Sequence, residues 1–443
     1  MIEKPNDSRY DGAERIVLRL RGAGHQALLA GGCVRDLLRG EAPQDYDVAT
    51  SARPEQVEAL FAVTRAVGRQ FGVCVAVVDG HPYQVATFRS EGGYTDGRHP
   101  DAVAFSGARE DARRRDFTIN GMFWDPVEGG VLDFVGGRAD LEAGLVRAIG
   151  DPAERFSEDH LRLLRAVRFA ARLGFAIEPA TRRAMKTLAH LAVEVSAERL
   201  QEELRIILTD RDPAGALRLM DELGMLLVIF PELADTKGCE QPENYHPEGD
   251  VFVHTILTVE QLGPYPGFVP AMAALLHDIG KPEASRLAGP KRFPEHCPIG
   301  RDMAYEVCRR LRLPGAETER ICWLVSRHLY FKDSRRMKDS TLKRLFVEPG
   351  FEQLAELHRA DALASWGNLE DYDYVMARRR DMPPEEAEPE PLITGHDLIE
   401  MGFEPGPLFG EVLGGVRDAQ LDGEIETPEE ARALARRIAE ERV

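Results

Sequence analysis

The sequence predicts an α+β head at the N-terminus, with a mixed sheet and helices, followed by an all-α neck, a second helical domain and a helical tail. Two observations support this fold class. Up to about residue 150, short apolar runs rich in β-branched residues alternate with helical segments and Gly-rich turns. Beyond residue 151, apolar residues recur at helical spacing. We therefore expect four parts, at residues 1–150, 151–235, 236–385 and 386–443.

Two pairs of apolar runs in the head indicate β-hairpins. Residues 73–78 and 83–88 flank Asp79-Gly80-His81-Pro82, a sequence typical of a turn. Residues 121–124 and 131–134 form a second pair around a Gly-containing connection. The head sheet should therefore contain these four strands in addition to the strands that precede them.

The neck and the later segments show helical periodicity interrupted by proline and glycine. Apolar residues at helical spacing occupy 161–169, 181–191 and 197–208. Pro231 and Gly238 then mark a boundary. The acidic, proline-rich stretch at residues 383–391 predicts an extended linker, and short helices are expected from residue 392 onward.

Composition places the chain among globular proteins. It has 443 residues and 43% hydrophobic content, yet it lacks the run of roughly 18 apolar residues that a membrane helix requires. The first ten residues are polar and charged, unlike a secretory signal, so we expect a cytoplasmic protein without a membrane association. Six cysteines without Cys-x-x-Cys spacing indicate reduced thiols.

The charge pattern limits how the chain can contact nucleic acid. A formal net charge of −19 argues against nonspecific coating of nucleic acid, which requires clustered Lys and Arg. Arginines nevertheless cluster at residues 113–115 and recur between residues 162 and 172. Any RNA contact is therefore expected in a local groove.

A glycine turn followed by two carboxylates carries the clearest chemistry. Residues 31–40 contain Gly-Gly and Arg35, and Asp45 and Asp47 follow one residue apart. Because strand side chains alternate in direction, the two aspartates should project from one face and share two divalent cations. Gly32 and its neighbour allow backbone amides close to a triphosphate, while Arg35 supplies a positive fork. The pattern indicates metal-assisted nucleotide chemistry.

A second charged segment, Arg114-Arg115-Asp116, runs into a strand-like apolar stretch at residues 117–119. We expect Arg115 to meet substrate phosphates or a nucleotide, and Asp116 to hold it in place. The alternative is a surface loop with a buried edge.

The segment 158–169 predicts one helix that presents Arg162, Arg165 and Arg168 along a single stripe. Asp159 stands one turn before Arg162. An acceptor beside a donor can read adenine and cytosine, which each present an exocyclic amine next to a ring-nitrogen acceptor. Guanine and uracil present the opposite order and would leave polar groups unpaired. The pair therefore predicts a protein template for A and C.

Together these motifs resemble the class II tRNA nucleotidyltransferase and bacterial poly(A) polymerase family. The resemblance covers about residues 15 to 235 and rests on residues 31–40, Asp45-Tyr46-Asp47, 115–120, Glu158-Asp159-x-x-Arg162 and Ser196-Ala197-Glu198-Arg199. It implies that Asp45 and Asp47 bind two catalytic Mg²⁺ ions and that Glu198-Arg199 supports the neck helix. It also implies contacts with ATP or CTP from Gly32, Arg35, Arg115, Asp159, Arg162, Arg165 and Arg168.

Within this family, the resemblance favours a tRNA substrate. Residues 94–100 match the flexible loop, which looks altered in members that add only CC, so its presence favours addition of CCA or of the terminal A. Residues 67–72 do not look like the longer basic motif often associated with poly(A) polymerase. Poly(A) synthesis remains the near alternative. The tail, from residue 391, resembles the family's C-terminal part, which would touch the tRNA elbow.

A second group of residues resembles the HD phosphohydrolase domain. The adjacent pair His277-Asp278 lies between His254 and Asp361 in the sequence. The resemblance makes these four the ligands of a divalent metal of the Ni, Mn, Mg or Zn class, with His296 and His328 as second-metal or phosphate contacts. The site is expected to be either active on a phosphate ester or an inactive relic.

Three classes of function are therefore weighed. They are a template-independent nucleotidyltransferase that uses ATP, CTP and tRNA and releases pyrophosphate, a metal phosphohydrolase whose first half only binds RNA, and a noncatalytic RNA-binding protein. The Asp45/Asp47 pair with Arg35 favours the first. Because of the predicted HD ligands, the metal phosphohydrolase remains an alternative, either as an added activity or as the main one. The sequence carries no indication of an oligomeric state.

Overall fold

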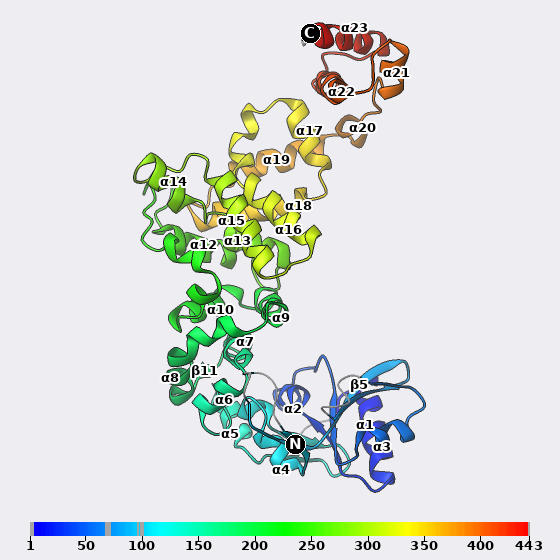
Figure 1. The fold of residues 1–443 in the computed structure, drawn as a ribbon, viewed down its shortest axis with the longest axis vertical. Helices are drawn as coiled ribbons and strands as arrows, with labels where there is room; N and C mark the ends of the chain where they lie inside the picture. The colour runs from blue at the N-terminus through cyan, green and yellow to red at the C-terminus, as the bar shows by residue number, and fades with distance from the viewer. Residues whose placement is uncertain (1–3, 67–71, 95–96, 98–101, 442–443) are drawn as a thin grey trace. The chain divides into compact units, whose positions relative to one another are not determined.

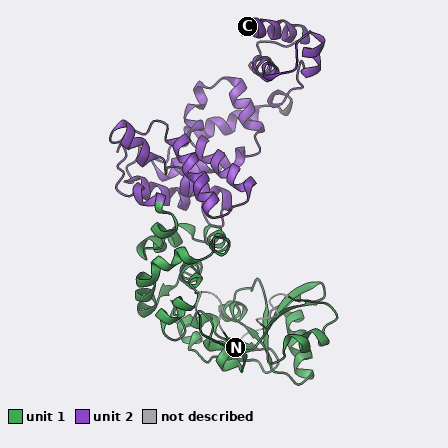
Figure 2. Ribbon diagram, in the orientation of Figure 1, with its two compact units in different colours: residues 1–231 green, residues 232–443 purple. Residues whose placement is uncertain are grey.

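The computed structural model describes residues 4–66, 72–94, 97 and 102–441. The chain divides into two compact units, residues 1–231 and residues 232–443 (Figures 1 and 2). The first unit contains the sheet and the neck helices, and the second is helical throughout its described part. The predicted fold class is therefore confirmed. Within the described residues, every helix is too short or too polar to cross a membrane.

The head is built on a mixed sheet whose described part has seven strands in the order β3-β4-β5-β2-β1-β8-β9. Only β2 and β5 pair in parallel, and the other neighbours are antiparallel. The strands are β1 (Ala27–Ala30), β2 (Asp47–Thr50), β3 (Thr64–Ala66), β4 (Val73–Val78), β5 (His81–Thr87), β8 (Phe123–Asp125) and β9 (Gly130–Leu132). Two small two-stranded sheets join β6 (Arg89–Gly92) with β7 (Ala102–Phe105) and β10 (Leu145–Val146) with β11 (Ala176–Ile177).

Both expected hairpins are present, with different ends. Strands β4 and β5 pair with Val78 opposite His81, so the turn is Asp79-Gly80 alone and not residues 79–82. Both turn residues have positive φ, 52° and 80°, as a type I′ turn requires. The second hairpin pairs β8 with β9. Away from the turn it is two residues shorter than expected, because β8 begins at Phe123 and β9 ends at Leu132.

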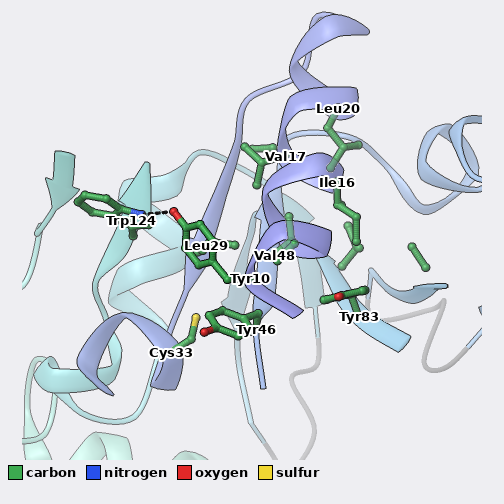
Figure 3. Packing of buried hydrophobic residues seen from close by; sticks show 14 of the residues in the cluster. Tyr10, Ile16, Val17, Leu20, Leu29, Cys33, Tyr46, Val48, Tyr83 and Trp124 are labelled. Atoms are coloured by element: carbon green, nitrogen blue, oxygen red, sulfur yellow. Dashed lines mark hydrogen bonds between the residues drawn. The ribbon is translucent and has the colours of Figure 1, made fainter. Parts of the chain in front are cut away.

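One face of the sheet is covered by α1 (Ser8–Gly22) and α3 (Pro54–Leu60), which pack on β1, β2, β4 and β5 (Figure 3). The core there joins Tyr10 of α1 to Leu29 and Val48 of the sheet. The indole of Trp124 donates a hydrogen bond to the Tyr10 hydroxyl at 3.3 Å. The other face packs against α4 (Ala108–Arg113) through a second apolar cluster. Burial on both faces explains why β1 is apolar at every position.

Strand register brings the glycine turn beside the carboxylates. Ala30, the last residue of β1, pairs with Asp47, the first residue of β2. Gly31 follows with φ of 76° and caps α2 (Gly32–Leu38), so the chain turns directly from the strand into this helix. Tyr46 points into the core under α1. Ala30 and Asp47, 17 positions apart in the sequence, are thus neighbours in the sheet.

The remaining helices of the first unit form the end of the head and the neck. They are α5 (Gly137–Glu142), η2 (Thr118–Asn120), α6 (Pro152–Glu158), α7 (Leu161–Leu173), α8 (Pro179–Leu188), η3 (Ala189–Glu194), α9 (Ala197–Leu208), α10 (Pro213–Glu222) and α11 (Leu226–Ile229). The expected helical character of the neck is confirmed, apart from the short β11 strand within it.

The prediction of one continuous helix over residues 158–169 is wrong. Helix α6 ends at Glu158, Asp159 is extended with φ of −147° and ψ of 103°, and α7 begins at Leu161. The Asp159 carboxylate accepts a hydrogen bond from the Leu161 amide at 3.2 Å, which satisfies one of the free donors at the start of α7. Asp159 therefore lies ahead of the helix that carries Arg162.

The second unit is an assembly of helices that ends in a small helical tail. Its elements are η4 (Pro231–Thr236, which starts at the boundary), α12 (Val251–Gln261), α13 (Phe268–Leu276), α14 (Lys281–Ala288), α15 (His296–Arg310), α16 (Gly315–Arg327), η5 (Tyr330–Arg336), α17 (Asp339–Val347), α18 (Phe351–Ala364), α19 (Glu370–Asp381), α20 (Pro384–Ala387), α21 (Gly395–Glu400), α22 (Pro407–Leu421) and α23 (Pro428–Glu440). The short helix α20 lies inside the stretch expected to be fully extended, so that expectation is wrong for these four residues.

Candidate active site and candidate metal centre

The first unit contains a cavity of about 520 Å³ between the glycine turn, the start of β2 and helix α7. All nine site residues predicted for the head and neck line this one cavity, namely Gly32, Arg35, Asp45, Asp47, Arg115, Asp159, Arg162, Arg165 and Arg168. Eight arginines and five aspartates line it in total, so its walls carry positive charge in a chain that is strongly acidic overall. Such a surface attracts a polyanion such as a triphosphate.

The two carboxylates enter the cavity from the start of β2. Asp47 is half-buried and Asp45 is exposed just before the strand, while Tyr46 between them is buried on the opposite side. Burial raises the pKa of Asp47 to about 6, Arg115 opposes the rise and the neighbouring charge of Asp45 adds to it. A cation shared by the two aspartates would relieve both the burial cost and the repulsion, so this donor pair fits Mg²⁺.

Arg115 approaches the glycine turn closely. Its guanidinium donates to the backbone carbonyl of Asn120 at 3.4 Å and to Asp111 at 3.1 Å. A Cβ atom on Gly31 would lie 3.0 Å from Arg115 Nη1. The glycine therefore provides the space in which Arg115 reaches the cavity.

The expectation that Asp116 holds Arg115 is wrong. Asp116 accepts two hydrogen bonds from Arg165 of α7, at 2.9 and 2.6 Å, and Asp111 takes its place beside Arg115. Burial opposes ionisation of Asp116, but Arg165 and the hydrogen bonds from Asn120 and the Phe117 amide lower its pKa to about 2. Asp116, a residue of the head, thus orients Arg165, a residue of the neck.

Arg35 is only 4% exposed and is fixed on both sides. It donates to the side-chain oxygen of Asn120 at 2.8 Å and pairs with Asp36 at 2.7 Å, and its guanidinium lies 5.2 Å from the centre of the Phe169 ring. Sequence reasoning assigned no role to the Asn120 amide or to Phe169. Their positions relative to Arg35 depend on contacts between distant segments, which the local pattern does not encode.

Asp159 and Arg162 both line the cavity, but each already has a protein partner. Arg199 of α9 donates to the two Asp159 oxygens at 3.0 and 2.9 Å. Arg162 donates to Glu158 at 2.6 Å and to two backbone carbonyls. The sequence resemblance gave Arg199 a supporting role for the neck helix, whereas its guanidinium lies directly on the predicted base-reading carboxylate.

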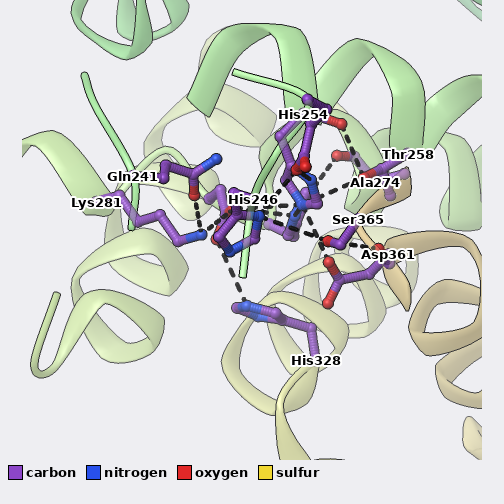
Figure 4. Close-up of polar contacts among 12 residues, drawn as sticks. Gln241, His246, His254, Thr258, Ala274, Lys281, His328, Asp361 and Ser365 are labelled. Atoms are coloured by element: carbon purple, nitrogen blue, oxygen red, sulfur yellow. Dashed lines mark hydrogen bonds and ion pairs between the residues drawn. The ribbon is translucent and has the colours of Figure 1, made fainter. Parts of the chain in front are cut away.

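A second polar centre lies in the second unit, where residues of α12, α15 and α18 meet residues that directly follow α13 and α16. Figure 4 labels His254, His328 and Asp361 among the predicted HD residues. His254 Nε2 lies 3.0 Å from Asp361 Oδ1 and 3.2 Å from His277 Nε2. His277 Nε2 lies 3.2 Å from Asp278 Oδ2. All four predicted ligands are therefore adjacent and almost fully buried.

His296 and His328 complete this centre on its other side. Their Nε2 atoms lie 3.4 Å apart, and each is 3.6 Å from Asp278 Oδ1. That oxygen is buried and accepts no hydrogen bond from the described residues. Burial lowers the pKa of His328 well below its usual range, so its ring is neutral, the form that binds metal. A buried carboxylate oxygen that accepts no hydrogen bond and faces two imidazole nitrogens fits a divalent cation.

Three further residues at this centre were missed by sequence reasoning. Glu248 Oε1 lies 2.7 Å from His254 Nδ1 and 2.9 Å from His246 Nδ1, and Cys297 Sγ lies 3.6 Å from His296 Nε2. Burial lowers the pKa of His254, but hydrogen bonds with Asp361 and Glu248 outweigh it and raise the pKa to about 9. The His-x-Glu spacing before α12 was the available sequence signal.

Sequence families match three separate regions of the chain. Residues 27–147 match the family described as the poly A polymerase head domain, residues 174–237 match a probable RNA and SrmB-binding site of polymerase A, and residues 255–366 match the HD domain. The first region contributes the wall around the glycine turn and the carboxylates, the second contributes Arg199, and the wall formed by residues 159–172 lies between the two. The third region contains most of the histidine and aspartate centre.

Relatives with curated names match over part or nearly all of the chain. The CCA-adding enzyme of Lactiplantibacillus plantarum is 41% identical over 49% of this chain, which spans about half (53%) of the length of that relative. The A-adding tRNA nucleotidyltransferase of Deinococcus radiodurans is 32% identical over 94% of this chain and 96% of its own length. The crystal structure of the Bacillus stearothermophilus CCA-adding enzyme in complex with CTP superposes with a TM-score of 0.73 at 27% identity, covering 98% of this chain and 99% of that one.

These matches agree with the cavity, which combines paired carboxylates with clustered arginines, and with the buried histidine and aspartate centre. The near full-length match at 32% identity extends across both units. The chain therefore belongs to the class II tRNA nucleotidyltransferase and bacterial poly(A) polymerase family, and it carries an HD domain.

Proposed function

We propose that the chain adds nucleotides from ATP and CTP to the 3′ end of tRNA, completing the CCA sequence without a nucleic-acid template. The observation that carries this proposal is the cavity that brings Asp45 and Asp47 together with Asp159, Arg162 and the clustered arginines. Relatives named as CCA-adding and A-adding enzymes support it. Addition of the terminal A is common to both groups of relatives, so AMP transfer to a tRNA ending in CC is the minimum activity proposed.

In the proposed reaction, the 3′ hydroxyl oxygen of tRNA forms a bond to the α-phosphorus and the bond to pyrophosphate breaks. Two Mg²⁺ ions held by Asp45 and Asp47 would supply charge neutralisation and a lowered pKa for the attacking hydroxyl. Arg35 and Arg115 bind phosphate oxygens, since both project into the cavity beside the glycine turn. Arg165 is oriented for the same purpose by Asp116.

The base is selected by Asp159 and Arg162. Asp159 accepts from the exocyclic amine of adenine or cytosine, and Arg162 donates to the ring nitrogen. Their present partners, Arg199 and Glu158, keep the acceptor and the donor in place before the nucleotide arrives. Guanine and uracil would place a carbonyl oxygen against the Asp159 carboxylate and an N–H group against the Arg162 guanidinium, two mismatches that cost free energy.

Changing the metal-binding carboxylates tests the proposal. Asp45→Asn and Asp47→Asn should each abolish nucleotide addition to a tRNA that lacks CCA, because a neutral amide cannot hold the cations. Asp79→Asn is the matched control, since Asp79 lies in the exposed β4–β5 turn of the same sheet. Turnover near wild type in Asp47→Asn would contradict the assignment. Extension of any RNA with ATP alone would assign the chain to poly(A) synthesis instead.

We also infer a second activity, metal-dependent hydrolysis of a phosphate ester at the HD centre. The uncompensated Asp278 oxygen facing His296 and His328 supports it, together with the adjacent His254, His277 and Asp361. A divalent ion of the Ni, Mn, Mg or Zn class held there would act as a Lewis acid and lower the pKa of a water.

Variants of the HD pair separate this second activity from the first. His277→Ala combined with Asp278→Ala should remove Mn²⁺-stimulated phosphatase or phosphodiesterase activity and leave nucleotide addition in place, because the two ligand sets lie in different units. His396→Ala, an exposed histidine of the tail, is the control for loss of an imidazole. Loss of both activities in a folded double variant would contradict their independence.

A further inference from the structure

Helix α16 of the second unit carries a stripe of arginine and aromatic side chains outside its packed face. Arg320, Trp323 and Arg327 lie three and four positions apart, so they share one side of the helix. The buried side chains of α16, Ile321 and Leu324 among them, belong to the side that packs on α13, α15 and α18. The three stripe residues are only half-buried. The stripe is therefore a feature of the surface and not of the core.

Two guanidinium groups lie against the ring of Trp323. The distance to the ring centre is 5.4 Å for Arg320 and 5.1 Å for Arg327. Arg327 also lies 5.5 Å from the ring centre of Tyr330 in η5. Gly350, in the turn before α18, leaves room for this arrangement, because a Cβ atom there would overlap Arg320 Nη1 and lie 2.8 Å from Trp323. The ring thus holds both guanidiniums in place before a ligand arrives.

Neither guanidinium pairs with a carboxylate among the residues that the structure describes. Arg327 donates one hydrogen bond to the Ser326 hydroxyl at 3.3 Å. The acidic residues of α16, Glu317 and Glu319, both precede Arg320 in the helix. The chain has 75 acidic residues against 56 Lys and Arg, so acidic partners are plentiful elsewhere. Two guanidiniums left without one on a single ring indicate a surface for an anion from outside the protein.

The geometry of the stripe favours the phosphate backbone of a nucleic acid over a single phosphate or a base. Arg320 and Arg327 are seven positions apart, which is about 10 Å along the helix axis. Side chains at this separation reach different phosphates of one chain. A guanidinium binds phosphate oxygens through parallel hydrogen bonds. Because both guanidiniums already cover Trp323, a base can stack on that ring only by displacing one of them.

We propose that Arg320, Trp323, Arg327 and Tyr330 form an RNA-binding surface in the second unit that holds the phosphate backbone of tRNA. The surface lies outside the nucleotide cavity and outside the cavity beside the HD centre. The identity of the RNA rests on the function proposed above. Contacts with phosphates position an RNA without reading its sequence, so this surface would add affinity and not base selectivity.

Equilibrium binding of the full-length protein to a tRNA ending in CC, in EDTA and without nucleotide, tests this surface. Arg320→Gln combined with Arg327→Gln should weaken binding. It should also reduce the slope of log Kd against log salt concentration by about two, one for each lost phosphate contact. Trp323→Leu keeps the net charge but removes the ring that holds the guanidiniums. It should weaken binding by about two- to thirtyfold, the range of a cation–π contact.

The matched control changes two arginines of the neighbouring helix α15. Arg301 and Arg309 are exposed and pair with Asp302 and Glu306 at 2.8 and 2.7 Å. Arg301→Gln combined with Arg309→Gln alters the net charge by the same amount and should keep the wild-type slope. The melting temperature of each variant reports its folding. If the double Gln variant of the stripe does not fold, the corresponding double Lys variant keeps the charge and should still weaken binding, because lysine lacks the planar fork.

Wild-type affinity and slope in the folded stripe variants, or an equal loss in the α15 control, would overturn the proposal. Wild-type tRNA binding together with lost self-association in sedimentation would assign the stripe to a contact with a second copy of this chain, and would overturn it as well. Because binding is measured without nucleotide, its dependence on the stripe is separate from catalysis. Stripe-dependent tRNA binding by a protein that adds no nucleotide would contradict the proposed function alone.

Discussion

Arg199 donates one hydrogen bond to each oxygen of the Asp159 carboxylate, at 3.0 and 2.9 Å. The two residues are 40 positions apart in the sequence, and Asp159 lies in the extended break between α6 and α7. The Leu161 amide holds one oxygen of this carboxylate at 3.2 Å, and the bidentate contact from α9 fixes both oxygens. The acceptor that we propose to read the base is thus positioned by Arg199 of the neck.

Arg199→Ala should reduce base discrimination. Without its bidentate partner the Asp159 carboxylate can rotate, and the preference for CTP and ATP over UTP and GTP should fall by about tenfold, in line with the loss of one charge-assisted contact. The measurement is kcat/KM for the four nucleotides. Arg183→Ala, an exposed arginine of α8, should keep the wild-type ratios. Unchanged ratios in Arg199→Ala would mean that Asp159 is oriented by other contacts.

Asp159→Ala and Arg35→Lys should behave differently from each other. Removing the acceptor should relax discrimination by about 1–3 kcal/mol, or roughly ten- to a hundredfold in the ratio of kcat/KM values. Arg35 is proposed to bind phosphates that all nucleotides share, so Arg35→Lys should weaken every nucleotide alike and keep the ratios. If Asp159→Ala retains the wild-type base preference, the residue positions the nucleotide without reading it.

Asp116→Asn should destabilise the first unit in a pH-dependent way. The pKa of Asp116 is about 2 in the folded protein against 3.8 ordinarily, so its ionised form adds stability above about pH 4 that is lost as the pH falls toward 2. The shift corresponds to about 2 kcal/mol at pH 7. Urea unfolding can be followed by Trp124 in a background with Trp323→Phe and Trp366→Phe.

The difference in unfolding free energy between Asp116→Asn and its parent should therefore be largest at neutral pH and should narrow below about pH 4. Asp79→Asn, an exposed turn residue, is the control for the same chemical change. A difference that is constant from pH 7 to pH 3 would show that the ion pair with Arg165 is not its source.

Gly31→Ala should impair nucleotide addition by displacing Arg115. Gly31 has φ of 76°, and an added Cβ would lie 3.0 Å from the Arg115 guanidinium. Gly24→Ala is the matched control, because Gly24 also has positive φ, 87°, but open space around it. Both variants should lose about 1–2 kcal/mol of stability from backbone strain. Only Gly31→Ala should raise KM for ATP. Equal KM values in the two variants would contradict the contact.

Local patterns were sufficient to predict the elements that build the cavity. The glycine turn, the Asp45/Asp47 pair and the β4–β5 hairpin each follow from residues that are close in the sequence. The break at Asp159 was not predicted, because the stripe of arginines was extended back to Glu158, whereas Asp159 is extended and its carboxylate bonds to the Leu161 amide and to Arg199.

Local sequence patterns also could not predict which distant residues pair with one another. Asp116 pairs with Arg165, 49 positions away, and Arg35 with Asn120, 85 positions away. Sequence proximity instead suggested Arg115 as the partner of Asp116. In the HD centre the types of the predicted ligands were recognisable, but the His-x-Glu spacing alone did not reveal the contact of Glu248 with His254, since this contact depends on how the segment before α12 folds.

The most direct test of the central claim is incubation of the full-length protein with three tRNAs, ending before CCA, after the first C, and after CC, with each labelled nucleotide supplied separately. We predict CMP addition to the first two tRNAs and AMP addition to the third, with little use of UTP or GTP. AMP addition to the third tRNA alone would assign the chain to terminal A addition. If the folded protein extends none of the three tRNAs, the account is contradicted.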